Sequence, residues 1–310
     1  MRVLITGATG LIGKEIVKLC HENEIKVNYL TTSKPKIENT ENYQGFYWNP
    51  DKKEIDTACF KGVDAIIHLV GASVSKRWTP AYKKEILNSR TESTQLLIDN
   101  LKGETHQIKQ VVSASAIGIY PDSLTNYYDQ SFNQTSDSFL GQVVKVWEAV
   151  VDGFAEVGVS VAKIRIGLVL SNKGGALVEL VKPIKYGLGA AFGSGKQWQS
   201  WIHITDLSNI FLYVLQHQLT GVYNGVAPNP VSNTELTKTV AGVLKKPLVL
   251  PNIPKLFMKL ILGEMHILLF ESQRVSSKKI QDKGFDFKFN YLEPALRDLL
   301  NLRFTKVYRH

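Results

Sequence analysis

The chain opens with Met1-Arg-Val-Leu-Ile-Thr-Gly-Ala-Thr-Gly-Leu-Ile-Gly13, a short apolar run that Gly7, Gly10 and Gly13 interrupt. Residues 2–5 are too few for a buried helix and predict a buried strand, whereas apolar residues within 12–19 recur at helical spacing. Glycines at a strand-to-helix junction let the backbone approach a pyrophosphate, whose charge the free N–H groups of the helix start stabilise. We therefore expect a dinucleotide site here, with an ordinary turn as the alternative.

The end of the second predicted strand, 26–31, bears on which dinucleotide is bound. NAD sites of this type usually place an Asp or Glu about 20 residues beyond the glycines, on the ribose 2′-hydroxyl. This chain instead continues with Thr32, Ser33 and Lys34. Hydroxyls and an ammonium can bind a 2′-phosphate, which a carboxylate would repel. The sequence therefore favours NADP(H) over NAD(H), and a solvated loop lysine is the alternative reading of Lys34.

The composition indicates an ordinary globular protein. The 310 residues are 44% hydrophobic and 21% charged, which is enough for one large domain or two modest ones. The net charge of +9 comes from scattered Lys and Arg without a dense basic run, so we expect no nucleic-acid partner. Cys20 and Cys59 lack metal-ligand spacing, and we expect packing roles in a reducing compartment and no metal.

Nothing in the sequence predicts membrane insertion or export. The apolar start lacks the basic region and long apolar stretch of a signal peptide. The most membrane-like segment, 256–270, is short and is interrupted by Lys259, Glu264 and His266, so a buried or groove-lining helix is expected there. We predict a cytoplasmic protein with no membrane contact, as a monomer or homodimer.

Strand-sized and helix-sized segments alternate through the first half of the chain. This alternation indicates βαβ units and an α/β fold with a doubly wound parallel Rossmann sheet. We expect a Rossmann domain at 1–166 and a smaller, mostly helical substrate lid at 167–310. The lid includes a small C-terminal domain from about 245, and elements of the two parts can interleave. The further predicted strands are 45–48, 63–70, 110–115 and 161–166; the predicted helices are 79–100, 140–157, 206–216, 232–244 and 255–270.

Several motifs together resemble the extended short-chain dehydrogenase/reductases, the group that contains sugar-nucleotide epimerases and dehydratases. The broader motifs are Thr6-Gly-Ala-Thr-Gly-Leu-Ile-Gly13, Ser113-Ala-Ser115 with Tyr120, and Trp201-Ile-His-Ile-Thr-Asp206. More narrowly, the chain resembles an atypical epimerase-like subgroup with a small C-terminal domain of unknown function. The narrower motifs are Ser113-Ala-Ser-Ala-Ile-Gly, Trp147-Glu148, Gly174-Gly-Ala-Leu177, Gly187-Leu-Gly189, Ser200-Trp-Ile-His203 and Ala227-Pro-Asn-Pro230.

The resemblance implies further cofactor and catalytic positions. Leu69, Val70 and Gly71, at the end of the fourth strand, would line the adenine and ribose side. Arg165 would belong to the turn beside the nicotinamide, and Arg90 could reach a phosphate. Ser113 and Ser115 fall where the family places its catalytic hydroxyl. The cofactor residues expected from the glycine motif and the resemblance together are Gly7, Thr9, Gly10, Leu11, Ile12, Gly13, Thr32, Ser33, Lys34, Leu69, Val70, Gly71, Arg90, Ser113 and Arg165.

The chain departs from this family at its acid/base pair. Typical members use a Tyr with a Lys four residues later, which lowers the Tyr pKa and holds the ribose. None of the twelve tyrosines here has a Lys at that spacing. Matching Glu148 to the family's helix glutamate puts Leu140 and Val144 at the two positions. Lys145 is one residue away, rotated by about 100° around the helix.

Two hypotheses follow from this departure. The first is an NADP-dependent oxidoreductase or epimerase of unknown substrate, in which Tyr120 or Ser115 donates the proton and Lys145 assists at the ribose. The second is a non-catalytic NADP(H)-sensing or interaction protein. Because losing a general acid typically costs about 10² to 10⁴ in rate, the first requires a substitute proton source.

Other polar residues receive narrower expectations. The segment 187–199 is expected to be a flexible substrate loop, with a plain surface hairpin as the alternative. In it, Lys196 and Gln197 could meet a small-molecule substrate that is anionic or resembles a sugar nucleotide. His68 is expected to be a hydrogen-bonded core histidine. His203 is expected to bridge core polar groups, with Thr205 as the N-cap of the following helix.

Overall fold

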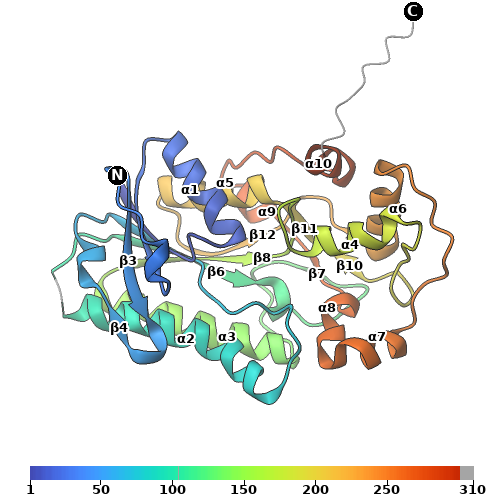
Figure 1. Ribbon diagram of the computed structural model, residues 1–310, viewed down its shortest axis with the longest axis horizontal. Helices are drawn as coiled ribbons and strands as arrows, with labels where there is room; N and C mark the ends of the chain where they lie inside the picture. Colours follow the sequence, from blue (N-terminus) through green and yellow to red (C-terminus); the bar gives the residue numbers. More distant parts are fainter. Residues whose placement is uncertain (104, 301–310) are drawn as a thin grey trace, which may run out of the picture.

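An eight-stranded sheet runs through the middle of the computed structural model, which describes residues 1–103 and 105–300 (Figure 1). The strand order is β12-β8-β6-β5-β1-β2-β3-β4, and all neighbouring pairs are parallel except β3 and β4. The predicted doubly wound parallel sheet is confirmed. Its strands are β1 (Arg2–Thr6), β2 (Lys26–Thr31), β3 (Tyr43–Asn49), β4 (Glu54–Ile55), β5 (Ala65–His68), β6 (Gln110–Ala116), β8 (Ser160–Ile166) and β12 (Gly221–Gly225).

Helices cover both faces of this sheet because its central strands are apolar on both sides. Every residue of β5 is buried, as are all residues of β1 except Arg2. On one face α1 (Leu11–Glu22) packs against α5 (Ile204–Gln216), and on the other α2 (Pro80–Lys102) packs against α3 (Phe139–Asp152) (Figure 1).

The rest of the second half of the chain forms a smaller region with its own apolar core. Leu177, Ile184, Leu236 and Leu296 are buried together in it. Three short strand pairs connect its segments, and one of them uses residues 127–128 of the first half. The helices are α4 (Ala176–Lys185), α6 (Asn233–Val243), α7 (Lys255–Leu262), α8 (Ile267–Phe270), α9 (Lys278–Gln281) and α10 (Leu292–Leu299); the strand pairs are β9 (Leu168–Leu170) with β11 (Trp201–His203), β10 (Trp198–Gln199) with β13 (Val231–Ser232), and β7 (Tyr127–Tyr128) with β14 (Arg274–Val275).

Two elements from beyond residue 166 belong to the layers of the sheet. β12 pairs in parallel with β8 along its whole length, from Gly221 opposite Ala162 to Gly225 opposite Ile166. α5 packs on α1. The Rossmann layers therefore use residues from both halves of the chain.

The structure corrects the expectation for 255–270. Gly263 adopts φ +60°, which ends α7, and a short turn separates it from α8, so the segment is not one helix. α7 contains no buried residue, and Leu256 and Leu260 are 70% and 75% exposed, so the first of the two expectations, a buried helix, was wrong, and a groove-lining helix stays a prediction. Across residues 1–103 and 105–300, no helix combines the length and apolarity needed to cross a bilayer.

Candidate functional site

The predicted glycine turn lies at the carboxyl end of β1. Gly7 adopts φ +70°, a conformation that favours glycine, and its carbonyl accepts a hydrogen bond of 2.9 Å from the Gly10 N–H. A Cβ on Gly7 would lie 3.3 Å from the backbone of Leu69, the residue that follows β5. The turn and the end of β5 are therefore in contact, as a cofactor crossing both strands requires.

The helix that follows presents its N-terminus without a side-chain cap. Gly10 is the N-cap of α1, and the first turn carries no acidic residue. A Cβ on Gly13 would lie 2.1 Å from the Gly7 carbonyl oxygen, so only glycine allows this approach of helix to turn. The geometry suits a pyrophosphate, because the uncompensated N–H groups at a helix start attract an anion.

The end of β2 lies beside this turn, because β2 pairs in parallel with β1 up to Leu30 opposite Thr6. Thr32 is exposed, and the Ser33 N–H donates to the Thr31 hydroxyl at 3.2 Å. Lys34 is also exposed, and its ammonium lies 5.0 Å from the centre of the Tyr47 ring. The three residues expected to select NADP(H) thus lie at the same sheet edge as the glycines.

His68 joins β1, β5 and α2 through a chain of hydrogen bonds. Its Nδ1 lies 2.9 Å from the Thr6 hydroxyl and its Nε2 lies 3.0 Å from the Thr94 hydroxyl. The Thr94 hydroxyl donates to the Arg90 carbonyl, so it accepts from His68 Nε2–H and leaves Nδ1 to accept from Thr6. The Thr6 oxygen accepts from the Leu69 N–H at 3.0 Å. The expectation of a hydrogen-bonded core histidine is confirmed.

This network keeps the imidazole neutral. His68 is fully buried, and this burial lowers its pKa to about 4. Protonation would also place a second N–H against the hydroxyl that already donates to Nδ1. The network therefore fixes the backbone of Leu69 beside the glycine turn, and the sequence gives no local signal for its partner Thr94.

Arg90 braces the loop after β5. Its guanidinium donates to the carbonyls of Ala72 and Ile86, at 3.2 and 2.8 Å, and lies over the Trp147 ring at 5.2 Å. A Cβ on Gly71 would approach the guanidinium carbon to 2.8 Å. Burial lowers the pKa of Arg90 to about 10. Arg90 therefore contacts the predicted cofactor loop, but its described partners are carbonyls of the chain itself.

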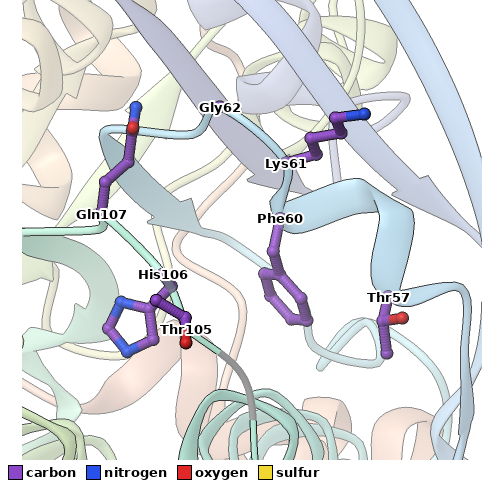
Figure 2. Close-up of a pocket in the computed structure, with 7 residues that line it drawn as sticks. All are labelled: Thr57, Phe60, Lys61, Gly62, Thr105, His106 and Gln107. Carbon is purple, nitrogen blue, oxygen red and sulfur yellow. The ribbon is translucent and has the colours of Figure 1, made fainter.

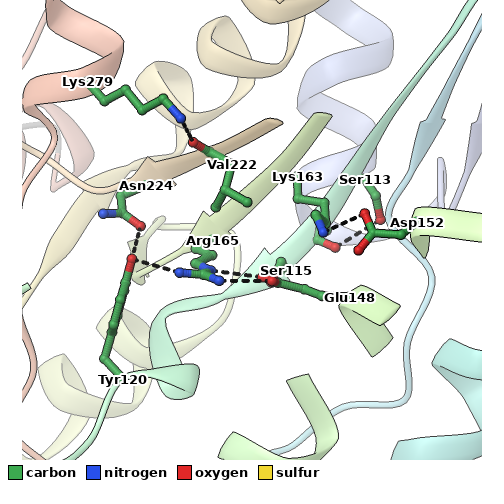
Figure 3. Close-up of polar contacts among 11 residues, drawn as sticks. Ser113, Ser115, Tyr120, Glu148, Asp152, Lys163, Arg165, Val222, Asn224 and Lys279 are labelled. Carbon is green, nitrogen blue, oxygen red and sulfur yellow. Dashed lines mark hydrogen bonds and ion pairs between the residues drawn. The ribbon is translucent and has the colours of Figure 1, made fainter. Parts of the chain in front are cut away.

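A buried cluster of charged and hydroxyl groups joins β6, β8 and α3 (Figure 3). Arg165 holds the Glu148 carboxylate with two nitrogens, Nε to Oε1 at 2.8 Å and Nη2 to Oε2 at 2.9 Å. The Ser115 hydroxyl donates to the same carboxylate. Ser113 is fully buried, and its hydroxyl donates to the carbonyl of Ala114. The network uses Ser115 and Arg165 inside the protein, and Ser113 is bonded to the adjacent backbone instead.

Tyr120 extends this network toward β12. Its hydroxyl donates to Asn224 Oδ1 at 2.9 Å and accepts from Arg165 Nη1 at 3.0 Å (Figure 3). The side chain is 1% exposed, and its burial raises the pKa of the phenol against the opposing effect of Arg165. Tyr120 therefore keeps its proton at neutral pH and donates it to an amide oxygen.

Comparison with known proteins agrees with this arrangement. The model of the NAD dependent epimerase/dehydratase family matches residues 3–225, and a domain of unknown function matches residues 253–299. The chain belongs to the NAD dependent epimerase/dehydratase family. Among its relatives, epimerase family protein SAR0825 of Staphylococcus aureus is 36% identical over 299 residues, which cover 96% of this chain and 98% of that protein. The predicted resemblance to the epimerase group with its C-terminal domain is confirmed.

Solved structures of the epimerase/dehydratase family superpose on nearly the whole chain. The human epimerase family protein SDR39U1, crystallised with NADPH, matches with a TM-score of 0.84 at 29% identity, over 97% of this chain and 99% of that one. The nucleoside-diphosphate sugar epimerase from Corynebacterium glutamicum matches with a TM-score of 0.78 at 27% identity, over 97% of this chain and 58% of that one.

The two α3 positions that the resemblance matches to the family's Tyr and Lys are packed apolar residues. Leu140 lies against Trp78 and its neighbours, and Val144 is buried in the cluster that contains Ile119 and Tyr120. Lys145 is exposed, on a helix whose buried face includes Val144 and Glu148. The described structure therefore does not bring Lys145 into the buried network that contains Ser115 and Tyr120.

The described residues line one cavity far from the carboxyl ends of the parallel strands, where the cofactor is expected, and one near them. One of about 280 Å³ lies at the opposite, amino ends of β5 and β6 and is lined by Thr57, Phe60, Lys61, Gly62, Thr105, His106 and Gln107 (Figure 2). It is separate from the expected cofactor edge. The other, of about 220 Å³, includes Tyr120 and Arg165 in its wall and is lined mainly by the polar segment 130–135.

The segment 187–199 is held by contacts with the C-terminal region. The Gly193 N–H donates to the Ile253 carbonyl at 2.8 Å, and the buried Gln197 amide donates to the carbonyls of Phe192 and Leu269. The side-chain amide of Gln197 has no remaining N–H for an anion, which counts against the expected substrate contact through this amide. Lys196 is exposed.

His203, rather than Thr205, is the N-cap of α5. The helix begins at Ile204, and His203 Nδ1 accepts a hydrogen bond of 3.1 Å from the Thr205 N–H. Its Nε2 lies 3.3 Å from an Asp298 carboxylate oxygen. Burial lowers the pKa of His203 to about 4, so the neutral ring caps the helix. The expected structural role holds, but the expected cap residue was wrong by two positions.

Proposed function

We propose that the chain binds NADP(H), with the pyrophosphate at 7–13 and the 2′-phosphate at Thr32, Ser33 and Lys34. The observation that carries the proposal is the uncapped start of α1, where Gly13 lies so close to the Gly7 carbonyl that a Cβ on Gly13 would overlap it. The lack of a carboxylate at the end of β2 favours the phosphorylated cofactor. The NADPH in the human relative supports the same choice.

The chain's own residues would shape the rest of this site. Thr9 would complete the turn around the pyrophosphate, and Leu11 and Ile12 would contribute the first N–H groups of α1. Leu69, Val70 and Gly71 would line the adenine and ribose side, where His68 and Arg90 fix the loop from behind. When bound, NADP(H) supplies or accepts a hydride, and the protein must provide the accompanying proton.

We assign the activity to the reduction or epimerisation of a small molecule that is anionic or resembles a sugar nucleotide. Family membership and the nucleoside-diphosphate sugar epimerase among the structural relatives support this class. Ser115 and Tyr120 are the proposed proton donors, because both lie at the carboxyl edge of β6. For either to act, substrate binding must release a hydroxyl from Glu148 or Asn224. The buried thiols Cys20 and Cys59 fit the proposed cytoplasmic location.

A specific observation favours a second function, that of an NADP(H) sensor without turnover. Leu140 and Val144 fill the two positions matched to the acid/base pair, and each packs in an apolar cluster. Neither can donate a proton or hold a ribose hydroxyl. The proposed pyrophosphate and 2′-phosphate contacts lie on α1 and after β2 rather than on α3, so binding would persist without catalysis although one ribose contact is lost.

Titration of NADPH and NADH against intrinsic tryptophan fluorescence tests the cofactor choice. Wild type is expected to bind NADPH more tightly, and Lys34→Glu is expected to weaken NADPH binding at least tenfold while leaving NADH binding unchanged. Lys36→Glu makes the same charge change two residues away, on another exposed side chain, and is expected to preserve the preference. Equal affinities of the wild type for the two cofactors would refute the proposed roles of Thr32, Ser33 and Lys34.

A panel of carbonyl compounds and nucleotide sugars separates enzyme from sensor. Oxidation of bound NADPH by a carbonyl compound, or epimerisation of a nucleotide sugar, would support the enzyme. Tight NADPH binding with no turnover of any member would support the sensor. A cofactor-bound structure with only Leu140, Val144 and water near the reacting carbon would exclude the proposed proton donors.

A further inference from the structure

Arg274, in the short strand β14, lies between aromatic residues from two distant segments. Its guanidinium carbon is 4.5 Å from the centre of the Trp198 ring and 5.0 Å from the centre of the Tyr127 ring. Both distances are those of a cation–π contact, which holds the guanidinium against the two rings. A contact with the face of a ring does not give the guanidinium N–H groups a hydrogen-bond acceptor.

The N–H groups of Arg274 have no partner in the described structure. No hydrogen bond and no ion pair within 4.0 Å joins its guanidinium to any residue of 1–103 or 105–300, and its Nε is buried without an acceptor. Arg165, by contrast, uses its nitrogens on Glu148 and Tyr120. A buried donor left without an acceptor is costly, and such groups in a folded protein require an explanation. A bound anion would supply the missing acceptors.

Trp198 is itself held in place from two sides. Its indole N–H donates to the Leu124 carbonyl at 3.0 Å, and its backbone N–H donates to the Ser272 hydroxyl at 3.0 Å. Tyr127 belongs to β7, and its Cα pairs directly with that of Arg274. The rings therefore belong to segments that the fold fixes, and they orient the guanidinium before any ligand arrives.

Arg274 also lies close to the proposed site. The side-chain amide of its neighbour Gln273 donates to the Tyr120 carbonyl at 3.1 Å, and the N–H of Val275 donates to the Ser200 hydroxyl at 2.9 Å. The Ser200 carbonyl in turn accepts a hydrogen bond from the N–H of Leu168, which lies two residues beyond β8. The strand β14 therefore adjoins the carboxyl edge of β6 and β8, where the substrate is proposed to react.

We propose that the Arg274 guanidinium binds the anionic group of the substrate, a phosphate or a carboxylate, and that Tyr127 and Trp198 fix its plane for this contact. The proposal rests on the proposed function and names a specificity residue for that same site. A planar guanidinium can donate two parallel hydrogen bonds to either anion, which an ammonium cannot. Arg274 would thus select substrates by charge, at a distance from the reacting carbon.

The direct test is the ¹⁵Nε–H resonance of Arg274, assigned by its loss in Arg274→Met. In full-length protein saturated with NADPH, inorganic pyrophosphate and succinate are titrated separately. A saturable shift with pyrophosphate supports a phosphate, and one with succinate supports a carboxylate. If neither anion moves the resonance at tens of millimolar, the proposal is overturned. This wild-type measurement does not depend on whether a variant folds.

Variants then test which feature of Arg274 matters. Arg274→Met and Arg274→Lys are each expected to weaken binding of the effective anion at least tenfold, with NADPH affinity unchanged. Arg297→Met, which removes the same charge from α10, is the matched control and is expected to bind the anion like wild type. Equal anion affinity in Arg274→Met and wild type would overturn the proposal. The protein could also fail to bind NADPH while the anion still shifts the Arg274 resonance in the absence of cofactor. That result would count against the proposed function and not against the role of Arg274.

Discussion

Arg165 of β8 forms a bidentate salt bridge with the carboxylate of Glu148 in α3, and both side chains are about 10% exposed. Removing one partner would leave a buried charge without compensation. Glu148→Ala is therefore expected to lower the free energy of unfolding by about 3–5 kcal/mol, measured by urea denaturation. Glu179→Ala, which breaks the exposed pair with Lys182, is the control and should cost about 1 kcal/mol or less.

The same pair predicts an acid sensitivity. Burial raises the pKa of Glu148, but the hydrogen bonds and charge of Arg165 outweigh it and hold the pKa below its usual value. Because the folded pKa is depressed, the contribution is present above the unfolded value of about 4.3 and is lost as the pH falls through the folded value. The stability difference between wild type and Glu148→Gln should therefore shrink below about pH 4. A difference that stays constant down to acid unfolding would contradict this assignment.

His68 predicts a second pH dependence at milder acidity. Burial lowers its folded pKa to about 4, so the unfolded chain binds a proton that the folded chain excludes between about pH 6.5 and pH 4. Stability should decline as the pH falls through this window, by about 3 kcal/mol from His68 alone. NMR titration of the ring should show a neutral Nε2–H tautomer at pH 6. A charged imidazole at that pH would refute the hydrogen-bond chain from Leu69 to Arg90. His203 contributes in the same window, so the two rings must be assigned separately.

Gly13→Ala tests the contact between turn and helix. The new Cβ would overlap the Gly7 carbonyl oxygen, so α1 must move away from the turn. We expect NADPH affinity to fall at least tenfold by fluorescence titration. Gly242→Ala is the matched control, because Gly242 is an exposed helical glycine with nothing within 4 Å of its added Cβ. It should leave binding unchanged and increase stability by about 0.5–1 kcal/mol. Wild-type affinity in Gly13→Ala would remove the structural basis of the proposed pyrophosphate site.

Tyr120→Phe separates a structural role from a proton-donating one. The change removes the acceptor of Arg165 Nη1 and the donor to Asn224 Oδ1, so thermal or urea unfolding should show a loss of about 1–3 kcal/mol. NADPH affinity should stay within about twofold because the phenol is remote from the glycine turn. Once a substrate is found, loss of about 10² to 10⁴ in turnover would identify Tyr120 as the acid. Unchanged turnover would leave it a structural residue.

The sheet and its cofactor edge could be predicted because their signals are local. Four apolar residues followed by spaced glycines specify β1, the turn and α1 without reference to the rest of the chain. The alternation of strands with helices then determines the parallel sheet. The hydrogen-bonded role of His68 also followed from its place inside an apolar strand, although its partner Thr94 did not.

The second half of the chain was less predictable because its structure depends on distant contacts. β7 and β14 have two residues each, and neither carries a periodic pattern that a sequence could reveal. The aromatic contacts of Arg274 exist only because this pairing brings Tyr127 to it and the hydrogen bond from the Trp198 N–H to Ser272 brings Trp198 to it. The break at Gly263 was missed since one glycine inside an apolar run is often tolerated in a helix.

The pairing of β12 with β8 also limits how this protein can be divided. A fragment that ended at residue 166 would leave β8, a seven-residue and largely buried strand, as an open edge with unpaired backbone groups. Such an edge is a template for association with other chains. The same fragment would lack α5, the helix that covers α1. A fragment that ends at residue 166 is therefore expected to aggregate, and any recombination that exchanges the substrate region would have to keep β12 and α5 with the first half.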